Sequence, residues 1–220
     1  MASISPEKPE ILLLCLASQS YLDQQYDALF FHMGNGAHLK RAKTAGGAIK
    51  YLESNSPKVI IATDEGLALP KNKPVFDKIV PFVQNGGLLI VGLHFPTFIY
   101  LDKFGSFFGA FGLPWISSDY TRATFKFNAA SKRPTELPMP APYYMKALHV
   151  KNARPEEKIF VPVTEAETSS SVIPAAYLEK TQAAVVGAKV GEGYVAYVGD
   201  VNGSKESNTI ILSLCGIESA

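Results

Sequence analysis

The sequence predicts one α/β domain, residues 1–220, built on a largely parallel sheet with antiparallel additions in its second half. In the first half, short apolar runs alternate with helical patterns, which is the signature of β-α-β units. In the second half, strands of alternating polarity and a hairpin replace that pattern. Hydrophobic residues make up 47% of the chain and charged residues 19%, which favours one substantial core and excludes a largely disordered chain.

The first half contains the elements of the parallel sheet in alternating order. We expect strands at residues 11–17, 38–42, 59–62 and 88–93. We expect helices at residues 21–33, 44–54, 73–84 and 100–111, where apolar residues recur three or four positions apart. Thr44 can cap the second helix, and the glycines at 34 and 36 should terminate the first. The right-handed crossover rule then places helices on both faces of the sheet.

The second half predicts antiparallel structure, and we expect residues 112–180 to elaborate the α/β core. Residues 121–127 alternate in polarity, as in a half-buried antiparallel or edge strand. Residues 132–142 contain four prolines and predict an extended surface loop. Further strands are expected at residues 145–150 and 159–163, a hairpin at 183–198, and a last helix from Ser204 or Ser207 to Cys215.

Composition excludes several classes of function. With 21 basic and 20 acidic residues, the chain lacks the clustered positive charge that nucleic-acid binding needs. No apolar run approaches the roughly 20 residues of a membrane span. Cys15 and Cys215 each lie in an apolar run, as inert buried thiols do. Because no cleavage signal precedes the first strand, we expect a cytoplasmic protein.

No cofactor or metal motif is present in the sequence. The glycines at 191 and 193 superficially fit a dinucleotide fingerprint, but a strand follows them where that fingerprint needs a helix. They therefore predict a hairpin turn. The chain has no phosphate-binding Walker loop, no Gly-x-Ser-x-Gly elbow and no His-x-x-x-His zinc pair. We accordingly predict no cofactor and no metal.

His94 is the best-placed titratable residue. It follows the buried strand 88–93, and ligands of open parallel sheets bind just outside the carboxyl ends of the strands. A helix that begins after His94 would add the positive end of its dipole to this position. The alternative is that His94 only forms a hydrogen bond with a neighbouring loop.

Two segments carry a resemblance to a known family. The run from Phe82 to His94 reads Phe-Val-x-x-Gly-Gly-x-x-x-x-Gly-Leu-His, and the tail from Val190 to Asp200 contains a Gly-x-Gly turn and a strand. Both are similar to segments of the trehalose-utilisation (ThuA-like) branch of the class I glutamine amidotransferase-like superfamily. The resemblance implies a three-layer, flavodoxin-like fold, in agreement with the pattern of elements.

The chain departs from the amidotransferase pattern at the catalytic positions. The resemblance implies a cysteine nucleophile within Gly-x-Cys-x-Gly, and here His94 stands at the cysteine's position and Pro96 at the second glycine's. The family's catalytic histidine would follow the last core strand, where this chain has Asp200. Without a thiolate and a paired imidazole, we expect no glutamine hydrolysis.

A polar set is expected to meet at the carboxyl ends of the strands. Its members are Asp64, Glu65, His94, Asp200 and Asn202. His94 next to carboxylates can act as a general acid or base, and the same groups can hold a divalent metal. Alternatively, Asp200 caps the last helix and Asp64 forms a turn.

An aromatic segment follows the strand that ends before His94. Phenylalanines 104, 107, 108 and 111 share one helical face, which favours core packing. Trp115, Tyr120 and Arg122 can instead line a pocket and hold a sugar or a planar ligand, with the tyrosines at 143 and 144 closing it.

The sequence leaves three functions open. The first is a cytosolic amidotransferase-like protein without glutaminase activity that binds a small ligand around His94. The second is a small-molecule hydrolase or isomerase, of carbohydrate-related substrates, in which Asp200 orients His94 as acid or base. The third is a homodimeric protein-interaction module that uses the aromatic residues 104–120.

Overall fold

The computed structural model describes residues 8–17, 19–163 and 181–218. The strands are β1 (Glu10–Leu14), β2 (His38–Ala42), β3 (Val59–Ala62), β4 (Leu88–Val91), β5 (Ile116–Phe127), β6 (Tyr143–Lys151), β7 (Lys158–Pro162), β8 (Val185–Val190) and β9 (Gly193–Val198). The α-helices are α1 (Leu22–Gln25), α2 (Asp27–Gly36), α3 (Ala45–Ser54), α4 (Lys73–Gln84), α5 (Phe95–Phe98), α6 (Leu101–Gly109) and α7 (Lys205–Leu214). Short 3-10 helices cover Glu65–Ala68, Pro70–Asn72 and Pro155–Glu157.

The strands form one nine-stranded sheet in the order β2-β1-β3-β4-β9-β8-β7-β5-β6. The pairs from β2 to β9 are parallel, and the pairs from β9 to β6 are antiparallel. This arrangement confirms the predicted α/β class, a flavodoxin-like sheet that is parallel in its first half and antiparallel in its second. The segment 164–180 of the expected elaboration lies outside the described residues.

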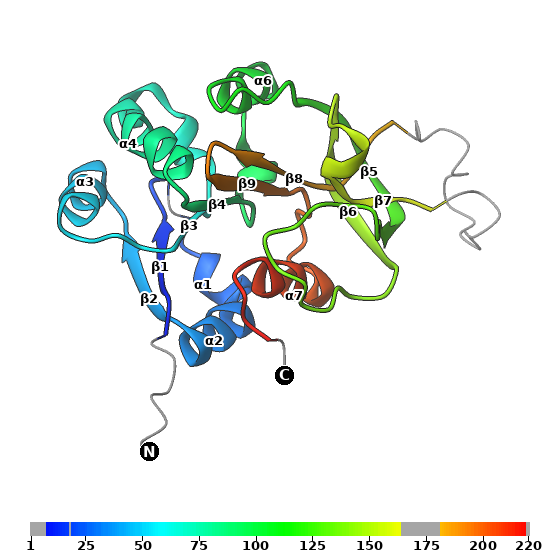
Figure 1. Ribbon diagram of the computed structural model, residues 1–220, viewed down its shortest axis with the longest axis horizontal. Coiled ribbons are helices and arrows are strands. Elements are labelled where there is room, and N and C mark those ends of the chain that lie inside the picture. Colours follow the sequence, from blue (N-terminus) through cyan, green and yellow to red (C-terminus); the bar gives the residue numbers. More distant parts are fainter. Residues whose placement is uncertain (1–7, 18, 164–180, 219–220) are drawn as a thin grey trace.

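Helices cover both faces of the sheet and make three layers (Figure 1). Helices α3, α4 and α6 lie on one side, and α1, α2 and α7 on the other. Each face carries its own cluster of buried side chains. All four residues of β3 and of β4 are buried, which explains why these strands are continuously apolar. The edge strand β2 alternates in exposure instead.

The first predicted helix was wrong in two respects. Residues 22–36 form two helices, α1 and α2, which meet at Tyr26, and the second continues through Gly34 and Gly36. Those glycines therefore do not terminate it. A Cβ atom at Gly36 would lie 2.7 Å from Cγ2 of Ile217, so this glycine allows the C-terminal segment to pack closely.

Further boundaries differ from the prediction. The expected strands at 11–17 and 88–93 end at Leu14 and Val91. A short helix, α5, precedes α6, so the expected helix at 100–111 is shorter and has a neighbour that the sequence did not reveal. Strand β5 begins at Ile116, five residues before the expected start, and lies between β7 and β6, which makes β6 the edge strand. The extended loop at 132–142 and the β8–β9 hairpin are confirmed.

The antiparallel half curls back to the carboxyl end of β9. Ala147 of β6 forms an isolated bridge with Asp200, and Val150 forms one with Ala183. The Leu148 amide donates to the carbonyl oxygen of Gly199 at 3.0 Å. These contacts connect the antiparallel strands to the carboxyl ends of the parallel strands, where His94 lies.

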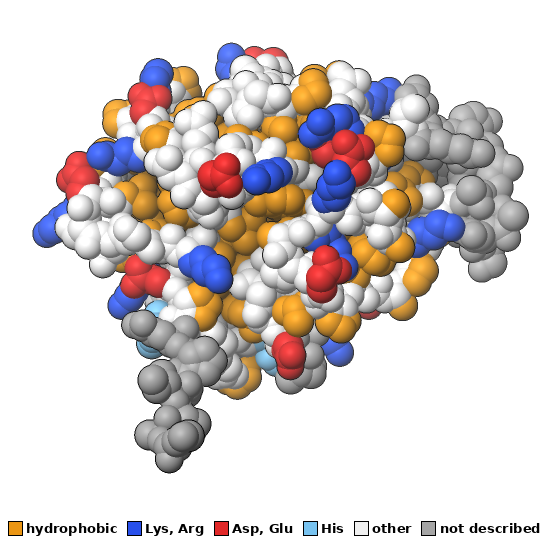
Figure 2. Space-filling view, viewed as in Figure 1, with side chains coloured by type: hydrophobic (Ala, Val, Ile, Leu, Met, Phe, Trp, Pro, Cys, Tyr) orange, Lys and Arg blue, Asp and Glu red, His pale blue; other side chains and the backbone are white. Residues whose placement is uncertain are grey.

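The surface carries no dominant charge on the side seen in Figure 2. Lys and Arg side chains are interspersed there with Asp and Glu, and apolar side chains lie between them. The chain as a whole has a net charge of +1. Within the described ranges, no helix has the length and apolar character needed to cross a membrane.

Candidate functional site at the carboxyl ends of the strands

The turn after β4 is a strained elbow. Leu93 has φ of +56°, a left-handed conformation that is uncommon for a residue with a side chain. The His94 amide donates to the carbonyl oxygen of Thr63 at 2.8 Å, and α5 begins at the next residue. A sharp strand-to-helix turn of this kind presents a nucleophile in hydrolases. Here its strained residue is an aliphatic leucine with no nucleophilic atom.

His94 is buried and held by Gln25. Its side-chain Nε2 lies 2.9 Å from Oε1 of Gln25, and the residue is only 2% exposed. An amide oxygen can only accept, so in this arrangement Nε2 carries the proton and donates it. Burial lowers the pKa of His94 below its usual value of 6.5, which favours the neutral ring. The imidazole is therefore a fixed, neutral group.

The second ring nitrogen of His94 has no hydrogen-bond partner among the residues that the structure describes. Nδ1 is buried, and no described atom bonds to it. Aromatic rings surround the imidazole: the ring centroids of Tyr21, Tyr26 and Phe98 lie 4.8, 5.5 and 5.9 Å from its own. Because an unpaired buried polar atom costs about 1–3 kcal/mol, its presence calls for an explanation.

Tyr26 contributes a second unpaired polar atom next to His94. Its hydroxyl is buried and lacks a partner among the described residues. Burial raises the pKa of Tyr26, and the nearby Asp200 carboxylate adds to this effect. A Cβ atom at Gly203 would lie 3.0 Å from Cε1 of Tyr26 and 3.3 Å from Nε2 of Gln25. The turn after β9 therefore packs directly on these two side chains.

Asp200 fixes that turn and does not orient His94. Its Oδ1 accepts the amide of Asn202 at 2.9 Å, and its Oδ2 accepts the amide of Ser204 at 2.8 Å. The carboxylate thus organises the start of α7, as the capping alternative anticipated. The partner of the imidazole is Gln25, which corrects the expected pairing of His94 with Asp200.

Asp64 has a similar structural role at the end of β3. Its Oδ1 accepts the amides of Ala17 at 3.0 Å and of Gly66 at 2.9 Å. Burial raises the pKa of Asp64, and these hydrogen bonds oppose that effect. Glu65, the next residue, has a buried Oε2 with no partner in the described structure, and burial raises its pKa. The Asp64 carboxylate is therefore already engaged in hydrogen bonds to the backbone, whereas Glu65 keeps one oxygen without a described partner.

The aromatic candidates lie elsewhere. Trp115 is fully buried, and its indole N–H donates to Oε2 of Glu157 at 2.9 Å, so it offers no surface to a ligand. The four phenylalanines of residues 104–111 are core residues, as expected. Tyr120 and Arg122 are exposed on the β5–β6 hairpin, where the Nζ atom of Lys146 lies 4.5 Å from the centroid of the Tyr120 ring. No described contact joins them to His94.

The thiols and acidic groups form no metal-binding cluster among the described residues. Cys15 and Cys215 are both buried. Burial raises the pKa of the Cys15 thiol and raises that of the Cys215 thiol to about 12. The residues described include no group of three or more His, Cys, Asp or Glu side chains arranged to hold a metal ion.

We refer to Gln25, Tyr26 and His94 as the carboxyl-end site. The sequence identified only His94 of these three. Gln25 and Tyr26 lie where α1 gives way to α2, and the apolar spacing of residues 21–33 concealed that break. Position in the sequence gave no signal for Gln25, because its role depends on a contact across 69 residues.

Comparison with known proteins supports the fold. No family model and no curated protein matches the sequence. Among solved structures, a ThuA-like protein from Bacteroides uniformis ATCC 8492 aligns with a TM-score of 0.61 at 11% identity, covering 97% of this chain and 93% of its own. A ThuA-like protein from Parabacteroides merdae ATCC 43184 aligns with a TM-score of 0.56 at 9% identity over 97% and 92%. The chain therefore has the fold of these ThuA-like proteins.

A partial match is found with a larger enzyme. The β-galactosidase from Rahnella sp. R3 aligns with a TM-score of 0.52 at 12% identity, covering 96% of this chain and 31% of the enzyme. The chain thus corresponds in fold to about a third of that enzyme. At this identity the match describes architecture alone.

Proposed function

We propose that this protein is a cytoplasmic amidotransferase-like protein that lacks glutaminase activity and binds a small ligand at the carboxyl-end site. The observation that carries the proposal is the unpaired Nδ1 of His94, a buried acceptor on a ring that Gln25 holds in place. The Tyr26 hydroxyl is a second group without a described partner, and the centroid of its ring lies 5.5 Å from that of His94. A ligand that supplies hydrogen bonds to both atoms would remove the cost of leaving them unpaired.

The chemistry at the elbow supports the proposed lack of glutaminase activity. Leu93 occupies the strained position and has no thiol, and the neighbouring His94 is a neutral ring held by Gln25. The two thiols lie in apolar surroundings that disfavour the thiolate. Among the described residues, the site holds no nucleophile and base couple of the kind that covalent catalysis requires.

The charge balance at the site favours an uncharged ligand. Asp64 and Asp200 accept backbone amides, and Gln25, Tyr26 and His94 are neutral. Burial raises the pKa of the Glu65 carboxyl, which favours its uncharged form. Neutral donors and acceptors next to the partly exposed Tyr21 ring suit a compact ligand with hydroxyl or amide groups. In the hydrolase or isomerase alternative, the Asp200 carboxylate would orient His94 for acid–base catalysis. Because Asp200 bonds to backbone amides and His94 bonds to Gln25, the geometry favours binding over that alternative.

Thermal unfolding with a panel of small molecules tests binding at this site. We would compare wild type with His94→Ala and Gln25→Ala, using neutral sugars, sugar acids, nucleotides and amino acids. A ligand at about 100 times its dissociation constant stabilises by about 2.7 kcal/mol, a shift of roughly 5–10 °C for a chain of this size. We expect at least one uncharged compound to shift wild type and neither variant.

His38→Ala is the matched control, because His38 is exposed on the edge strand β2. It should respond to the panel as wild type does. An uncharged compound that shifts His94→Ala as much as wild type would place the ligand elsewhere and contradict the proposal. Ammonia release from glutamine that exceeds the buffer blank, and that is lost in Cys15→Ser or Cys215→Ser, would contradict the absence of glutaminase activity.

A further inference from the structure

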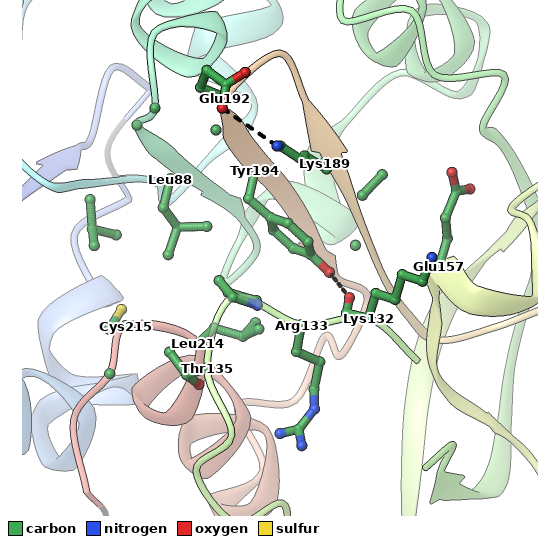
Figure 3. A pocket seen from close by; sticks show the side chains of 18 of the residues that line it. Leu88, Lys132, Arg133, Thr135, Glu157, Lys189, Glu192, Tyr194, Leu214 and Cys215 are labelled. Carbon is green, nitrogen blue, oxygen red and sulfur yellow. Dashed lines mark hydrogen bonds and ion pairs between the residues drawn. The ribbon is translucent and has the colours of Figure 1, made fainter. Parts of the chain in front are cut away.

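A cavity of about 630 Å³ opens at the opposite end of the sheet (Figure 3). Its wall includes Val59 at the start of β3, Leu88 at the start of β4 and Gly193 at the start of β9. These are the amino ends of the parallel strands, so the cavity is separate from the carboxyl-end site. We call it the amino-end cavity. Its volume lies within the range of about 300–1,000 Å³ that is typical of small-molecule sites.

Hydrogen bonds hold the proline-containing loop against this cavity. The Tyr194 hydroxyl donates to the carbonyl oxygen of Lys132 at 2.6 Å, and the Thr135 hydroxyl donates to that of Ser213 at 2.6 Å. The Ser213 hydroxyl in turn donates to the carbonyl oxygen of Pro138 at 2.7 Å. Figure 3 shows Tyr194 reaching across to this loop. The loop thus forms one wall of the cavity and is held in place by hydrogen bonds to β9 and α7.

The interior of the amino-end cavity is apolar. Leu88, Tyr194, Leu214 and Cys215 contribute side chains from the core cluster that packs under α7. Gly187 lies under the Tyr194 ring: a Cβ atom there would be 2.3 Å from the Tyr194 hydroxyl oxygen. The glycine therefore gives the ring room to lie flat against β8 and leaves open space beside it.

The rim of the amino-end cavity carries an excess of positive charge. The cationic lining residues are Lys58, Lys132, Arg133, Arg154 and Lys189. The acidic lining residues are Glu156, Glu157 and Glu192. Each of these carboxylates has a cationic partner: Arg154 lies 2.6 Å from Glu157 and 3.6 Å from Glu156, and Lys189 lies 3.5 Å from Glu192.

Two lysines of the cavity lining, Lys58 and Lys132, form no described ion pair. In the part of the chain that the structure describes, no carboxylate lies within ion-pair distance of Lys58 or Lys132. Arg133 is occupied, because its guanidinium lies 3.5 Å from Glu136 and packs on the Phe127 ring. Lys58 comes from the segment before β3 and Lys132 from the loop, so the two lysines belong to separate parts of the wall.

We propose that the amino-end cavity binds a small amphipathic anion, an organic acid with an apolar body. The apolar body lies against Leu88, Tyr194 and Leu214, and the anionic group lies at the rim near Lys58 and Lys132. Apolar burial supplies most of the affinity, and the lysines select the sign of the charge.

Fluorescence titration with 1-anilinonaphthalene-8-sulfonate, itself an amphipathic anion, tests the proposal. We expect the native protein to bind the dye, and we expect Lys58→Ala/Lys132→Ala to weaken binding about fivefold, because an exposed charge interaction contributes roughly 0.2–1 kcal/mol. Lys40→Ala/Lys43→Ala removes the same charge from β2 and the loop after it, and should leave the affinity unchanged. Circular dichroism would verify that all variants are folded.

Competition with a matched pair of probes separates charge from apolar contact. Decanoate should displace the dye at lower concentration than decanol, which has the same chain length and no charge. His94→Ala should leave dye binding unchanged, since the two sites lie at opposite ends of the sheet. Equal displacement by decanol, equal loss in the Lys40→Ala/Lys43→Ala control, or loss in His94→Ala would each overturn the proposal.

Discussion

The two ends of the parallel sheet use their charged side chains differently. At the carboxyl end, the buried Asp64 and Asp200 accept backbone amides, and the described atoms that remain unpaired are Nδ1 of His94, the Tyr26 hydroxyl and Oε2 of Glu65, whose pKa burial raises towards the neutral form. At the amino end, the carboxylates are paired with cations, and what remains unpaired is positive. The groups that folding leaves without a partner thus differ in charge, and they favour different classes of ligand.

The largest effect should come from removing the Asp200 carboxylate. Asp200→Ala should lower the free energy of unfolding by about 3 kcal/mol, because hydrogen bonds to a charged acceptor contribute roughly 1.5–3 kcal/mol each and two would be lost. Urea unfolding would measure the change. Asp200→Asn should recover part of it, since an amide oxygen can still accept one of the two bonds.

This variant also separates structure from catalysis at the carboxyl end. An Asp200→Ala protein that unfolds at the wild-type urea concentration would contradict the structural role of the carboxylate. It would then restore the alternative in which Asp200 orients His94.

The sequence predicted the parallel half well because its signals are local. Continuous apolar runs identified β3 and β4, and Thr44 capped α3 as expected, its hydroxyl oxygen accepting the Gly47 amide at 3.1 Å. The positions of Asp64, His94 and Asp200 at strand ends followed from the same patterns. Their bonds did not, because each carboxylate had both a structural and a chemical use that local sequence cannot distinguish.

The features that the sequence missed depend on distant contacts. Trp115 was a candidate ligand contact, yet its N–H binds Glu157, which lies 42 residues away. The amino-end cavity is assembled from β3, β4, β8, β9, α7 and the proline loop. No local pattern marks such a space, because it exists only after these elements have packed together.

The next effect concerns the pH dependence of stability, which depends on the two buried histidines. Burial lowers the pKa of both His94 and His149, so the unfolded chain binds more protons than the folded one below about pH 6.5. The free energy of unfolding should therefore decrease as the pH falls from 7 towards 5.5. The raised pKa values of Asp64 and Glu65 act in the opposite direction, in a window above their usual values near 4.

Urea unfolding at a series of pH values would measure this dependence. His94→Gln and His149→Gln should each flatten the slope between pH 7 and 5.5, and His38→Gln should preserve it. A slope that survives in the protein lacking both buried histidines would show that other groups control the acid response.

A smaller effect is expected at the amino end. Tyr194→Phe removes the hydrogen bond to the Lys132 carbonyl oxygen and should lower the free energy of unfolding by about 1 kcal/mol. It should also weaken the binding of anilinonaphthalene sulfonate, because the loop wall loses one attachment. Thermal responses to ligands of the carboxyl-end site should not change. If they did, the two ends would be coupled and the comparison would fail.

The smallest effect is expected from the unpaired lysines. Lys58→Ala/Lys132→Ala should change the free energy of unfolding by no more than about 0.5 kcal/mol per site, the usual range for exposed residues with no partner. The same protein should bind the anionic dye less tightly. A large loss of stability in urea would mean that these lysines support the fold and are not reserved for a ligand.

Nitrogen-15 NMR of the histidine rings tests the central claim most directly. At pH 7 and without ligand, we predict that His94 is neutral, with its proton on Nε2 towards Gln25 and a bare Nδ1. A stabilising compound from the thermal panel should change the Nδ1 resonance and leave the Nε2 proton in place. A proton on Nδ1 in the free protein, or an Nδ1 resonance that no stabilising compound alters, would contradict the assignment of His94 as the ligand acceptor.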